Sequence, residues 1–281
     1  MKFCSYRLDG VSSYGVVTSE NQIIDLKAEF GSKYPTLLSA LRAGAWDSLV
    51  LRENASSEPM PVEAVEFLPV FEEAVSIHCV GLNYAEHTKE AGVKQPSFPR
   101  TFMKIPSAIV GHQQPLEKPA LSPEYDFEGE LAVVIGKTAR NVPAQEAHQY
   151  IAGYTCFMDG SVRDWQLQRT LDQGKNFYRS SAIGPYVVTA DEVGPLGDLA
   201  LQTLLNGKVM QSTVFANMIF PVARLIEYIS SFTRLLPGDI IATGTPEGVG
   251  FKRVPPVYLQ QGDKLEVKIE NVGSLVNNIA R

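Results

Sequence analysis

Two glutamates stand two positions apart at the start of an apolar run. In YDFEGELAVVIGK, Glu128 and Glu130 come just before residues 131–135. Those five residues are apolar, are rich in β-branched side chains and are followed by Gly136. This pattern predicts a buried β-strand. Side chains alternate faces along a strand, so both carboxylates point to the same side, roughly 7 Å apart along the chain.

Neighbouring carboxylates that leave water repel each other, and burial costs each of them on the order of several kcal/mol. A shared proton, a basic partner or a divalent cation would relieve that repulsion, and oxygen ligands favour Mg²⁺, Mn²⁺ or Ca²⁺. Asp159, which ends the apolar run YTCFMDG, is the expected third ligand, and Asp126, further out on the same strand face, is the alternative. On spacing alone, a solvated strand entrance with two exposed glutamates is the commoner explanation.

One histidine has an acid at helical spacing. His87 and Glu90 in NYAEHTKE are three residues apart, so on a helical turn they share a face and can form a hydrogen bond. An imidazole oriented by a carboxylate can act as a general base towards water, whereas a weak surface contact is the plainer alternative. The following AGVKQPSFP predicts a long loop that could act as a lid. His78, inside the apolar SIHCV, is expected to be a core histidine.

The glycine-rich GTPEGVG does not indicate a nucleotide site. Gly244, Gly248 and Gly250 do not fit GxGxxG, and no helical pattern follows them. QGKNF likewise lacks the upstream glycine of a phosphate-binding loop. We expect residues 243–250 to form a tight loop that brings backbone N–H groups and Thr245 close to a small anion.

Composition excludes several classes of function. The chain has 281 residues with 44% hydrophobic and 20% charged residues, which is typical of a globular protein. Its net charge of −6 and the lack of a basic cluster argue against nucleic acid as a partner. No signal-peptide pattern and no apolar stretch long enough for a membrane span is seen. Three distant cysteines, Cys4, Cys79 and Cys156, suit a reducing compartment, so we expect a cytoplasmic protein with buried, free thiols.

Short strands with few helices predict a β-rich α+β fold. The clearest elements are a helix in PTLLSALRAG, a hairpin around Asn206-Gly207, an amphipathic helix in FPVARLIEYISSF and a closing hairpin in KLEVKIENVGSLVNNI. The polar, proline-containing ASSEPMPVEAVEFLP at residues 55–69 predicts a domain boundary. We therefore expect a small N-terminal domain over residues 1–70 and a catalytic domain over residues 71–281.

Seven motifs, taken together, resemble the fumarylacetoacetate hydrolase superfamily in its bacterial two-domain form. They are GLNYAEHTKE, FMKIPSAIVGH, YDFEGELAVVIGK, DGSVRDWQ, GKNF, NGKVMQSTVFANMIFPVARLI and GDIIATGTPEGVG, which occur in family order from about residue 75 to the end of the chain. The resemblance implies a mixed β-sandwich roll for the catalytic domain, usually assembled as a homodimer.

The resemblance also implies roles for individual residues. Glu128, Glu130 and Asp159 match ligands of Mg²⁺ or Mn²⁺, with Ca²⁺ a possible substitute in crystals. His87 and Glu90 match a dyad that activates water, and Lys175 matches a lysine that stabilises developing negative charge. Substrate-binding positions of the family match Lys104, Arg163, Gln166 and Thr245.

Family members act on 2-oxo acids. The first hypothesis is hydrolysis of a C–C bond in an acylpyruvate or another diketo acid, as in aromatic catabolism, with release of pyruvate or a similar product. The alternatives are an oxaloacetate-type decarboxylase, a tautomerase, or an isomerase of the 2-hydroxyhepta-2,4-diene-1,7-dioate type. The third hypothesis is a protein that binds metal and a 2-oxo acid without catalysis. The presence of His87, Glu90 and Lys175 argues against it, because a protein that only binds needs no general base. Where relatives often continue KSFD, this chain has KNFYRSS, so Tyr178 and Arg179 are expected either to reshape the pocket or to face solvent.

Overall fold

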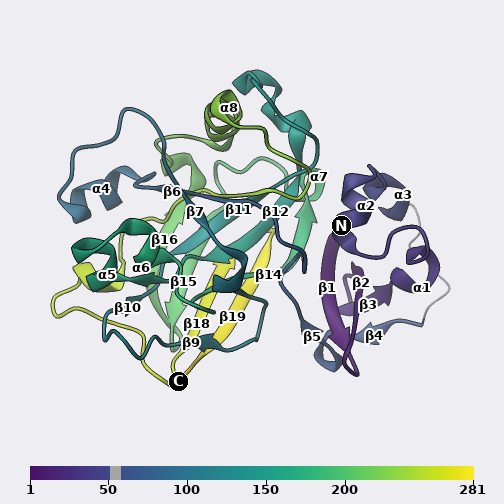
Figure 1. Ribbon diagram of the computed structural model, residues 1–281, viewed down its shortest axis with the longest axis horizontal. Coiled ribbons are helices and arrows are strands. Elements are labelled where there is room, and N and C mark those ends of the chain that lie inside the picture. Colours follow the sequence, from purple (N-terminus) through teal and green to yellow (C-terminus); the bar gives the residue numbers. More distant parts are fainter. Residues whose placement is uncertain (51–57) are drawn as a thin grey trace.

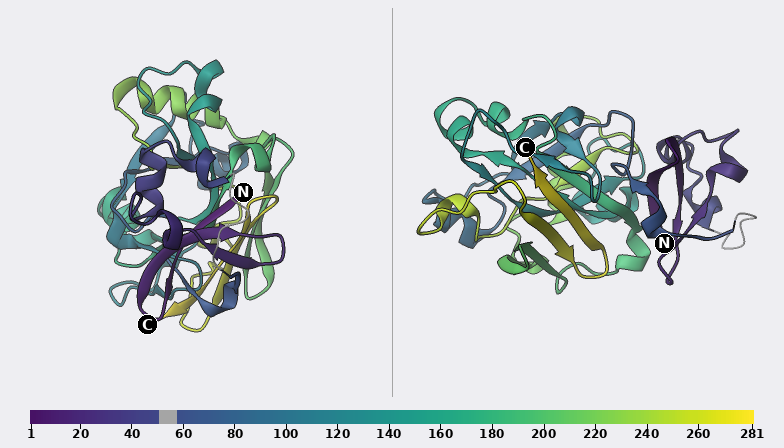
Figure 2. Two further views of the ribbon diagram at one scale, coloured as in Figure 1. Left: turned by 90° about the vertical axis from the view of Figure 1, so that its right-hand side faces the viewer. Right: turned by 90° about the horizontal axis from the view of Figure 1, so that it is seen from below.

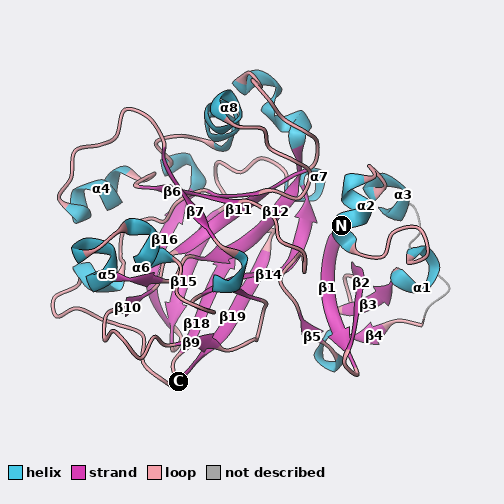
Figure 3. Ribbon diagram, viewed as in Figure 1, coloured by secondary structure: helices cyan, strands magenta, loops and turns pink. Residues whose placement is uncertain are grey.

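The computed structural model describes residues 1–50 and 58–281. Strands make up the centre of the molecule, and short helices lie at its periphery (Figure 3). The N-terminal strands and helices lie beside the larger body in Figure 1, at one end of the elongated shape that the right-hand view of Figure 2 shows. The expected β-rich α+β architecture is confirmed.

The largest sheet runs through both parts of the chain. Its strands follow the spatial order β4-β3-β2-β1-β14-β12-β11-β17-β6-β7, with β5 beside β1 and β8 beside β14. Their bounds are β1 (Lys2–Leu8), β2 (Val11–Val17), β3 (Gln22–Asp25), β4 (Met60–Pro61), β5 (Glu66–Phe67), β6 (Ile77–Gly81), β7 (Arg100–Lys104), β8 (Ile109–Val110), β11 (Gly129–Ile135), β12 (Ile151–Met158), β14 (Ser181–Thr189) and β17 (Ile240–Ala242).

A second sheet packs against this one. It has the order β16-β15-β18-β19-β9, and β10 pairs with β13 in a separate ribbon. The bounds are β9 (Leu116–Glu117), β10 (Tyr125–Asp126), β13 (Ser161–Val162), β15 (Ala200–Leu205), β16 (Lys208–Val214), β18 (Lys264–Ile269) and β19 (Gly273–Ala280). A Cβ added to Gly129 would lie 2.0 Å from Thr203 Oγ1, so β11 approaches β15 at a distance that only glycine permits.

Strand β11 is buried on both faces. All seven of its residues are buried. Leu131, Val133 and Ile135 pack into one hydrophobic cluster with the second sheet, whereas Ala132 and Val134 pack into another cluster on the opposite face. Because each face of the strand meets a different core, the sequence is continuously apolar and does not alternate.

The helices are short except the last. They are α1 (Lys27–Phe30), α2 (Leu37–Arg42), α3 (Trp46–Val50), α4 (Ala85–Ala91), α5 (Arg163–Gln168), α6 (Leu171–Lys175), α7 (Ala190–Val193) and α8 (Val222–Phe232). The expected helix α2 begins at a Thr36–Ser39 capping box. Helix α8 buries Val222, Leu225, Ile226 and Ile229 on one face, as its sequence pattern predicts.

The two parts of the chain share a sheet. Strand β1 pairs antiparallel with β14, with Lys2 opposite Val188 and Phe3 opposite Val187. The division at residue 70 therefore stays a prediction, and residues 51–57 of the boundary region lie outside the described part of the chain. Cys4, Cys79 and Cys156 are buried and free, as expected. Among the described helices, none combines the length and apolarity that crossing a bilayer would need.

His112 joins the N-terminal segment to the second sheet in its neutral form. Its Nδ1 accepts a hydrogen bond from Val276 N at 3.1 Å, and its ring packs edge-on against Phe67. Burial lowers the pKa of His112 from 6.5 to about 4, although Glu266 acts in the opposite direction. An acceptor nitrogen in a partly apolar place carries no proton, so protonation would break this contact.

Acid should therefore destabilise the protein through His112. The unfolded chain binds the proton at a higher pH than the folded one, so stability is full above about pH 6.5 and is lost as the pH falls towards 4. Between pH 7.5 and pH 5 this group alone should cost about 2 kcal/mol of unfolding free energy. In His112→Asn the amide oxygen can accept from Val276 N without titrating, so denaturant unfolding should show a smaller loss for the variant. An equal loss in both proteins would refute the assignment.

Candidate active site

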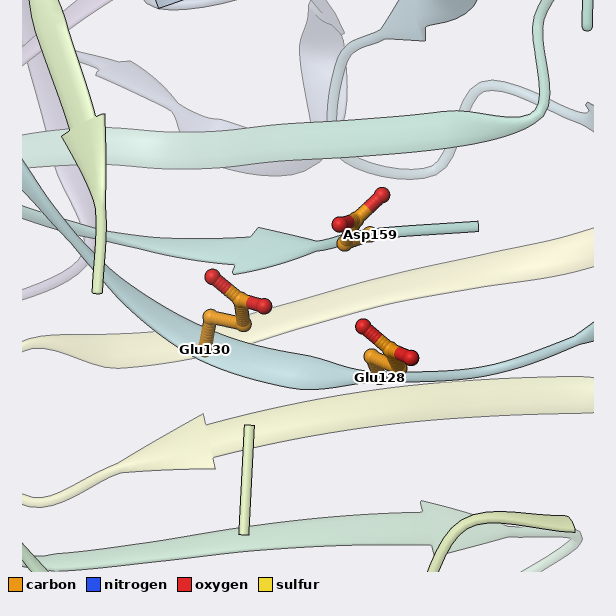
Figure 4. A group of neighbouring side chains, drawn as sticks. All are labelled: Glu128, Glu130 and Asp159. Atoms are coloured by element: carbon orange, nitrogen blue, oxygen red, sulfur yellow. The ribbon is translucent and has the colours of Figure 1, made fainter. Parts of the chain in front are cut away.

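Three acidic side chains meet where β11 and β12 lie side by side. Glu128 and Glu130 project from one strand towards Asp159, which follows the end of the next (Figure 4). Asp159 N donates to Glu128 O at 2.9 Å, which sets the alignment of the two strands. One ligand atom from each of the three lies within 4.8 Å of the others, and all three residues are buried. The structure thus brings together the expected trio and rules out the exposed strand entrance.

Basic side chains neutralise two of these acids. Lys175 Nζ donates to Glu128 Oε2 at 2.7 Å and to Asp159 Oδ2 at 2.9 Å. Arg163 lies 2.7 Å from Glu128 Oε1, and Lys104 lies 2.5 Å from Asp159 Oδ1. These pairs are almost fully buried, so each charge depends on its partner.

Glu130 is the exception. Its Oε2 accepts from Gly244 N at 2.9 Å, and within the described chain no ion pair reaches its carboxylate. Burial raises the pKa of Glu130 well above its usual range, and the charges of Asp159 and Glu128 raise it further. Burial acts in the same direction on Glu128, but Lys175 and Arg163 outweigh it and hold the pKa of that carboxyl well below its usual range.

This donor set fits a hard divalent cation. The three side chains supply only carboxylate oxygens, which suit Mg²⁺, Mn²⁺ or Ca²⁺ better than zinc. A cation beside Glu130 would offset the burial of a carboxylate that two neighbouring acids repel and that only the Gly244 N–H and the nearby charge of Lys175 stabilise within the described chain. The trio could therefore bind a divalent metal, with Glu128, Glu130 and Asp159 as its protein ligands.

Asp126, the alternative third ligand, has another role. Its carboxylate accepts from Arg163 Nε at 2.8 Å and from the backbone N–H groups of Phe127, Gly250 and Phe251 at 2.8, 2.8 and 3.1 Å. Four donors saturate this group, and it lies outside the trio. It fixes Arg163 to the loop after β17, a role that the sequence reading missed.

Arg163 keeps one donor free. Its Nη1 donates to Gln166 Oε1 at 2.9 Å, whereas its Nη2 is buried and finds no hydrogen-bond partner among the described residues. An unpaired buried N–H group costs about 1–3 kcal/mol. Arg163 and Gln166 both line the cavity described below, so this donor and the Gln166 amide can receive an anionic ligand.

The histidine–glutamate pair forms as expected. His87 Nδ1 and Glu90 Oε2 lie 3.1 Å apart on α4. The other carboxylate oxygen of Glu90 accepts from Gly248 N at 3.0 Å, which ties α4 to the loop after β17. When Nδ1 is held by Glu90, Nε2 is the nitrogen left to exchange a proton.

Some of these groups line a cavity of about 310 Å³. Its walls include His87, Glu128, Arg163, Gln166, Lys175 and Thr245. Lys104 is not among the lining residues; it holds Asp159 and the backbone carbonyl of Lys175. Tyr178 and Arg179 do not line the cavity either. Tyr178 is 63% exposed and Arg179 pairs with Glu117, so of the two expectations the solvent-facing one holds.

Two buried amides brace the loop that follows β17. Gln211 donates to Thr245 Oγ1 and Pro246 O and accepts from Gly129 N. Asn83 donates to Thr243 O at 2.7 Å. The sequence reading did not single out either residue. In the sequence each of them is a polar residue within one of the family motifs, and that position alone does not indicate which group it contacts.

Replacement of Glu130 by Gln should separate metal binding from folding. The amide carries no charge to bury, so the metal-free variant should melt at or above the wild-type temperature. Wild-type protein at a metal concentration of 100 Kd should gain about 2.7 kcal/mol, and the variant should lose most of this gain. Thermal melts with Mg²⁺, Mn²⁺ and EDTA test this, with exposed Glu86→Gln as the control. A wild-type melting temperature that neither Mg²⁺ nor Mn²⁺ changes would refute the proposed metal site.

Asp126→Asn should act on stability. The amide N–H₂ would face the donors of Arg163 and Phe251, so the folded state should lose about 3 kcal/mol, as when one member of a buried ion pair is removed. Denaturant unfolding measures this against Asp164→Asn, a change at a partly exposed acid that follows Arg163 on α5. Unchanged stability of Asp126→Asn would show that the four hydrogen bonds are dispensable.

Comparison with known proteins identifies the family of this chain. A family model for the C-terminal part of fumarylacetoacetate (FAA) hydrolase matches residues 76–280. A mitochondrial oxaloacetate tautomerase from Bos taurus is 41% identical over 262 residues, which cover 92% of this chain and 83% of the relative.

Two solved structures extend the likeness to the whole chain. Fumarylacetoacetate hydrolase from Exiguobacterium antarcticum matches with a TM-score of 0.89 and 33% identity, covering 100% of both chains. Maleylpyruvate hydrolase from Sphingobium sp. SYK-6, in complex with manganese(II) ion and pyruvate, matches with a TM-score of 0.81 and 27% identity, covering 100% of this chain and 99% of that one. The chain belongs to the fumarylacetoacetate hydrolase family.

Proposed function

We propose that the protein is a divalent-metal-dependent hydrolase that cleaves a C–C bond in an acylpyruvate-type diketo acid and releases pyruvate or a similar 2-oxo acid. One observation carries the proposal: His87, whose Nδ1 lies 3.1 Å from Glu90 Oε2, lines the same cavity as Lys175 and as Glu128 of the acidic trio. A bound Mg²⁺ or Mn²⁺ would supply Lewis-acid stabilisation of negative charge on the 2-oxo acid.

The chain's own residues would divide the remaining work. Arg163 Nη2 and the Gln166 amide would bind the carboxylate of the substrate, because both residues line the cavity and Arg163 Nη2 has no hydrogen-bond partner within the described chain. Lys175 would stabilise the negative charge that develops on the keto oxygen. Thr245 is held by Gln211 and donates to Gly129 O, so it forms a fixed part of the wall.

The dyad would generate the nucleophile. His87 Nε2 takes a proton from water while Glu90 holds Nδ1, and the water oxygen bonds to the acyl carbonyl carbon. The C–C bond to the pyruvyl half then breaks, and its electron pair remains on that half as an enolate. Protonation of the enolate carbon gives the 2-oxo acid, and the acyl half leaves as a carboxylic acid.

Keto–enol tautomerisation of oxaloacetate is the second candidate. It is favoured by the relative from Bos taurus, which carries that name and aligns with 92% of this chain. In that reaction His87 would move a proton between carbon and oxygen of the substrate, and no C–C bond would break. Both reactions need His87 as a base, and they are distinguished by their products.

A His87→Ala variant tests the dyad. General-base assistance contributes roughly 10²–10⁴-fold, so hydrolysis of acetylpyruvate should fall by at least 10²-fold. Loss of diketone absorbance and appearance of pyruvate measure the reaction, with exposed His148→Ala as the control. A near-normal rate in His87→Ala would remove the dyad from the mechanism.

Product analysis of the wild-type enzyme tests the reaction class. Chelator-sensitive release of pyruvate and acetate from acetylpyruvate is the expected result. Interconversion of the enol and keto forms of oxaloacetate, without cleavage of any acylpyruvate, would support the second candidate. Pyruvate formed only from oxaloacetate would indicate decarboxylation.

A further inference from the structure

One peptide unit connects a buried side-chain amide to the acidic trio. Asn83 Nδ2 donates to Thr243 O at 2.7 Å, and Gly244 N donates to Glu130 Oε2 at 2.9 Å. The carbonyl of Thr243 and the N–H of Gly244 belong to the same planar peptide group and point in opposite directions, because a trans peptide places them on opposite sides. Asn83 and Glu130 are therefore linked through a single rigid unit.

The side chain of Asn83 is itself held in place. It is fully buried, its Oδ1 accepts from Phe220 N at 2.8 Å, and its Nδ2 also donates to Phe220 O at 3.0 Å. Only the nitrogen of an amide can donate to a carbonyl, so this double contact fixes which end faces Thr243. Both N–H groups of Asn83 are thus used, and the side chain cannot turn without breaking these bonds.

The peptide between Thr243 and Gly244 would turn easily without such a contact. Gly244 has a φ of +97°, and glycine adopts negative φ values at little cost. A change in ψ of Thr243 and φ of Gly244 would rotate the peptide and exchange the positions of its N–H and C=O groups, as in the interconversion of type I and type II turns. Glu130 would then face a carbonyl oxygen in place of a donor.

The other contacts of Thr243 do not prevent this rotation. Its N–H and its hydroxyl group donate to Leu131 O at 2.9 and 3.0 Å, but both groups lie before the bond about which ψ rotates. Among the described residues, no other side chain donates to Thr243 O. A Cβ atom added to Gly244 would lie 2.8 Å from the Cβ atom of Asn83, so the loop packs directly on this asparagine. Asn83 is therefore the side chain that opposes the rotation.

The orientation of Glu130 depends on this peptide more than that of its neighbours does. Glu128 and Asp159 are oriented by the buried ion pairs described above, whereas Glu130 forms no ion pair within the described chain and accepts from Gly244 N. Groups behind a metal ligand that fix its orientation also affect how tightly the ion binds.

We infer that Asn83 is a positioning residue for the metal site. Through the Thr243–Gly244 peptide it holds Glu130 in the orientation that receives the cation, and it thereby raises the affinity of the trio for a divalent ion. The inference rests on the proposed function, because the bound metal is part of that function. Asn83 itself touches neither the metal nor the substrate in this account.

Mn²⁺ binding to the metal-free protein tests the inference apart from catalysis. Asn83→Ala removes the donor and side-chain volume, whereas Asn83→Leu removes the donor and keeps a similar volume. Titration followed by the electron paramagnetic resonance signal of free Mn²⁺ should show binding weakened about tenfold in both variants. Asn277→Ala is the matched control and should leave the affinity unchanged. Asn277 is a buried asparagine on β19 that donates to Gly111 O and Gln114 O, both at 2.8 Å.

The amide resonance of Gly244 reports the orientation of the peptide directly. In protein labelled with ¹⁵N-glycine, this proton should move upfield in both Asn83 variants, because a carboxylate no longer accepts it. The Gly248 amide, which donates to Glu90 Oε1 at 3.0 Å, should keep its position. If neither variant folds, Mg²⁺ titration of the wild-type protein should shift the Gly244 amide and the Asn83 side-chain amide with one apparent Kd.

Several results would overturn the inference. Unchanged Mn²⁺ affinity in both variants, an unmoved Gly244 amide, or an Asn83 side-chain amide that Mg²⁺ does not shift would each reject it and leave the proposed function intact. Weaker binding in Asn83→Ala alone would show a packing effect, and an equal loss in Asn277→Ala would show a general effect of destabilisation. Failure of the wild-type protein to bind Mn²⁺ would reject the proposed function, and the inference with it.

Discussion

The burial of acidic side chains at the junction of β11 and β12 governs the rest of this structure. Three carboxylates within 4.8 Å of one another cannot all be charged in an apolar interior without cations. Lys104, Lys175 and Arg163 supply them from three different elements. Each basic side chain must therefore arrive at one point, and the packing of β7, α5 and α6 around β11 follows from that requirement.

The basic side chains do not neutralise the three acids equally, and this difference favours the binding of a metal cation. Glu128 and Asp159 are ion-paired, whereas Glu130 receives one backbone N–H. A site whose charges were fully matched would have little affinity for a further cation. Glu130, whose carboxylate forms no ion pair within the described chain, is the group that a divalent ion would stabilise most.

The residues that hold the acidic trio in place differ from those that line the cavity, so the site is both rigid and accessible. Strand β11 is held on both faces by separate cores, so Glu130 is fixed in position. Asp126 and Gln211 fix the neighbouring arginine and loop through saturated hydrogen bonds. His87 and Arg163, which line the cavity, are anchored by hydrogen bonds to Glu90 and to Asp126 and Gln166.

The sequence by itself determined the strands, the hairpin at Asn206-Gly207, the helix α8 and the spacing of the acidic trio, because these depend on local periodicity and turn chemistry. Family motifs added the identity of the metal-ligand candidates and of the His87–Glu90 pair. Only the tertiary structure decided which buried charges meet, because ion pairs such as Lys104–Asp159 join residues far apart along the chain. It also paired Asp126 with Arg163, since strand order and loop packing bring together residues that no sequence period relates.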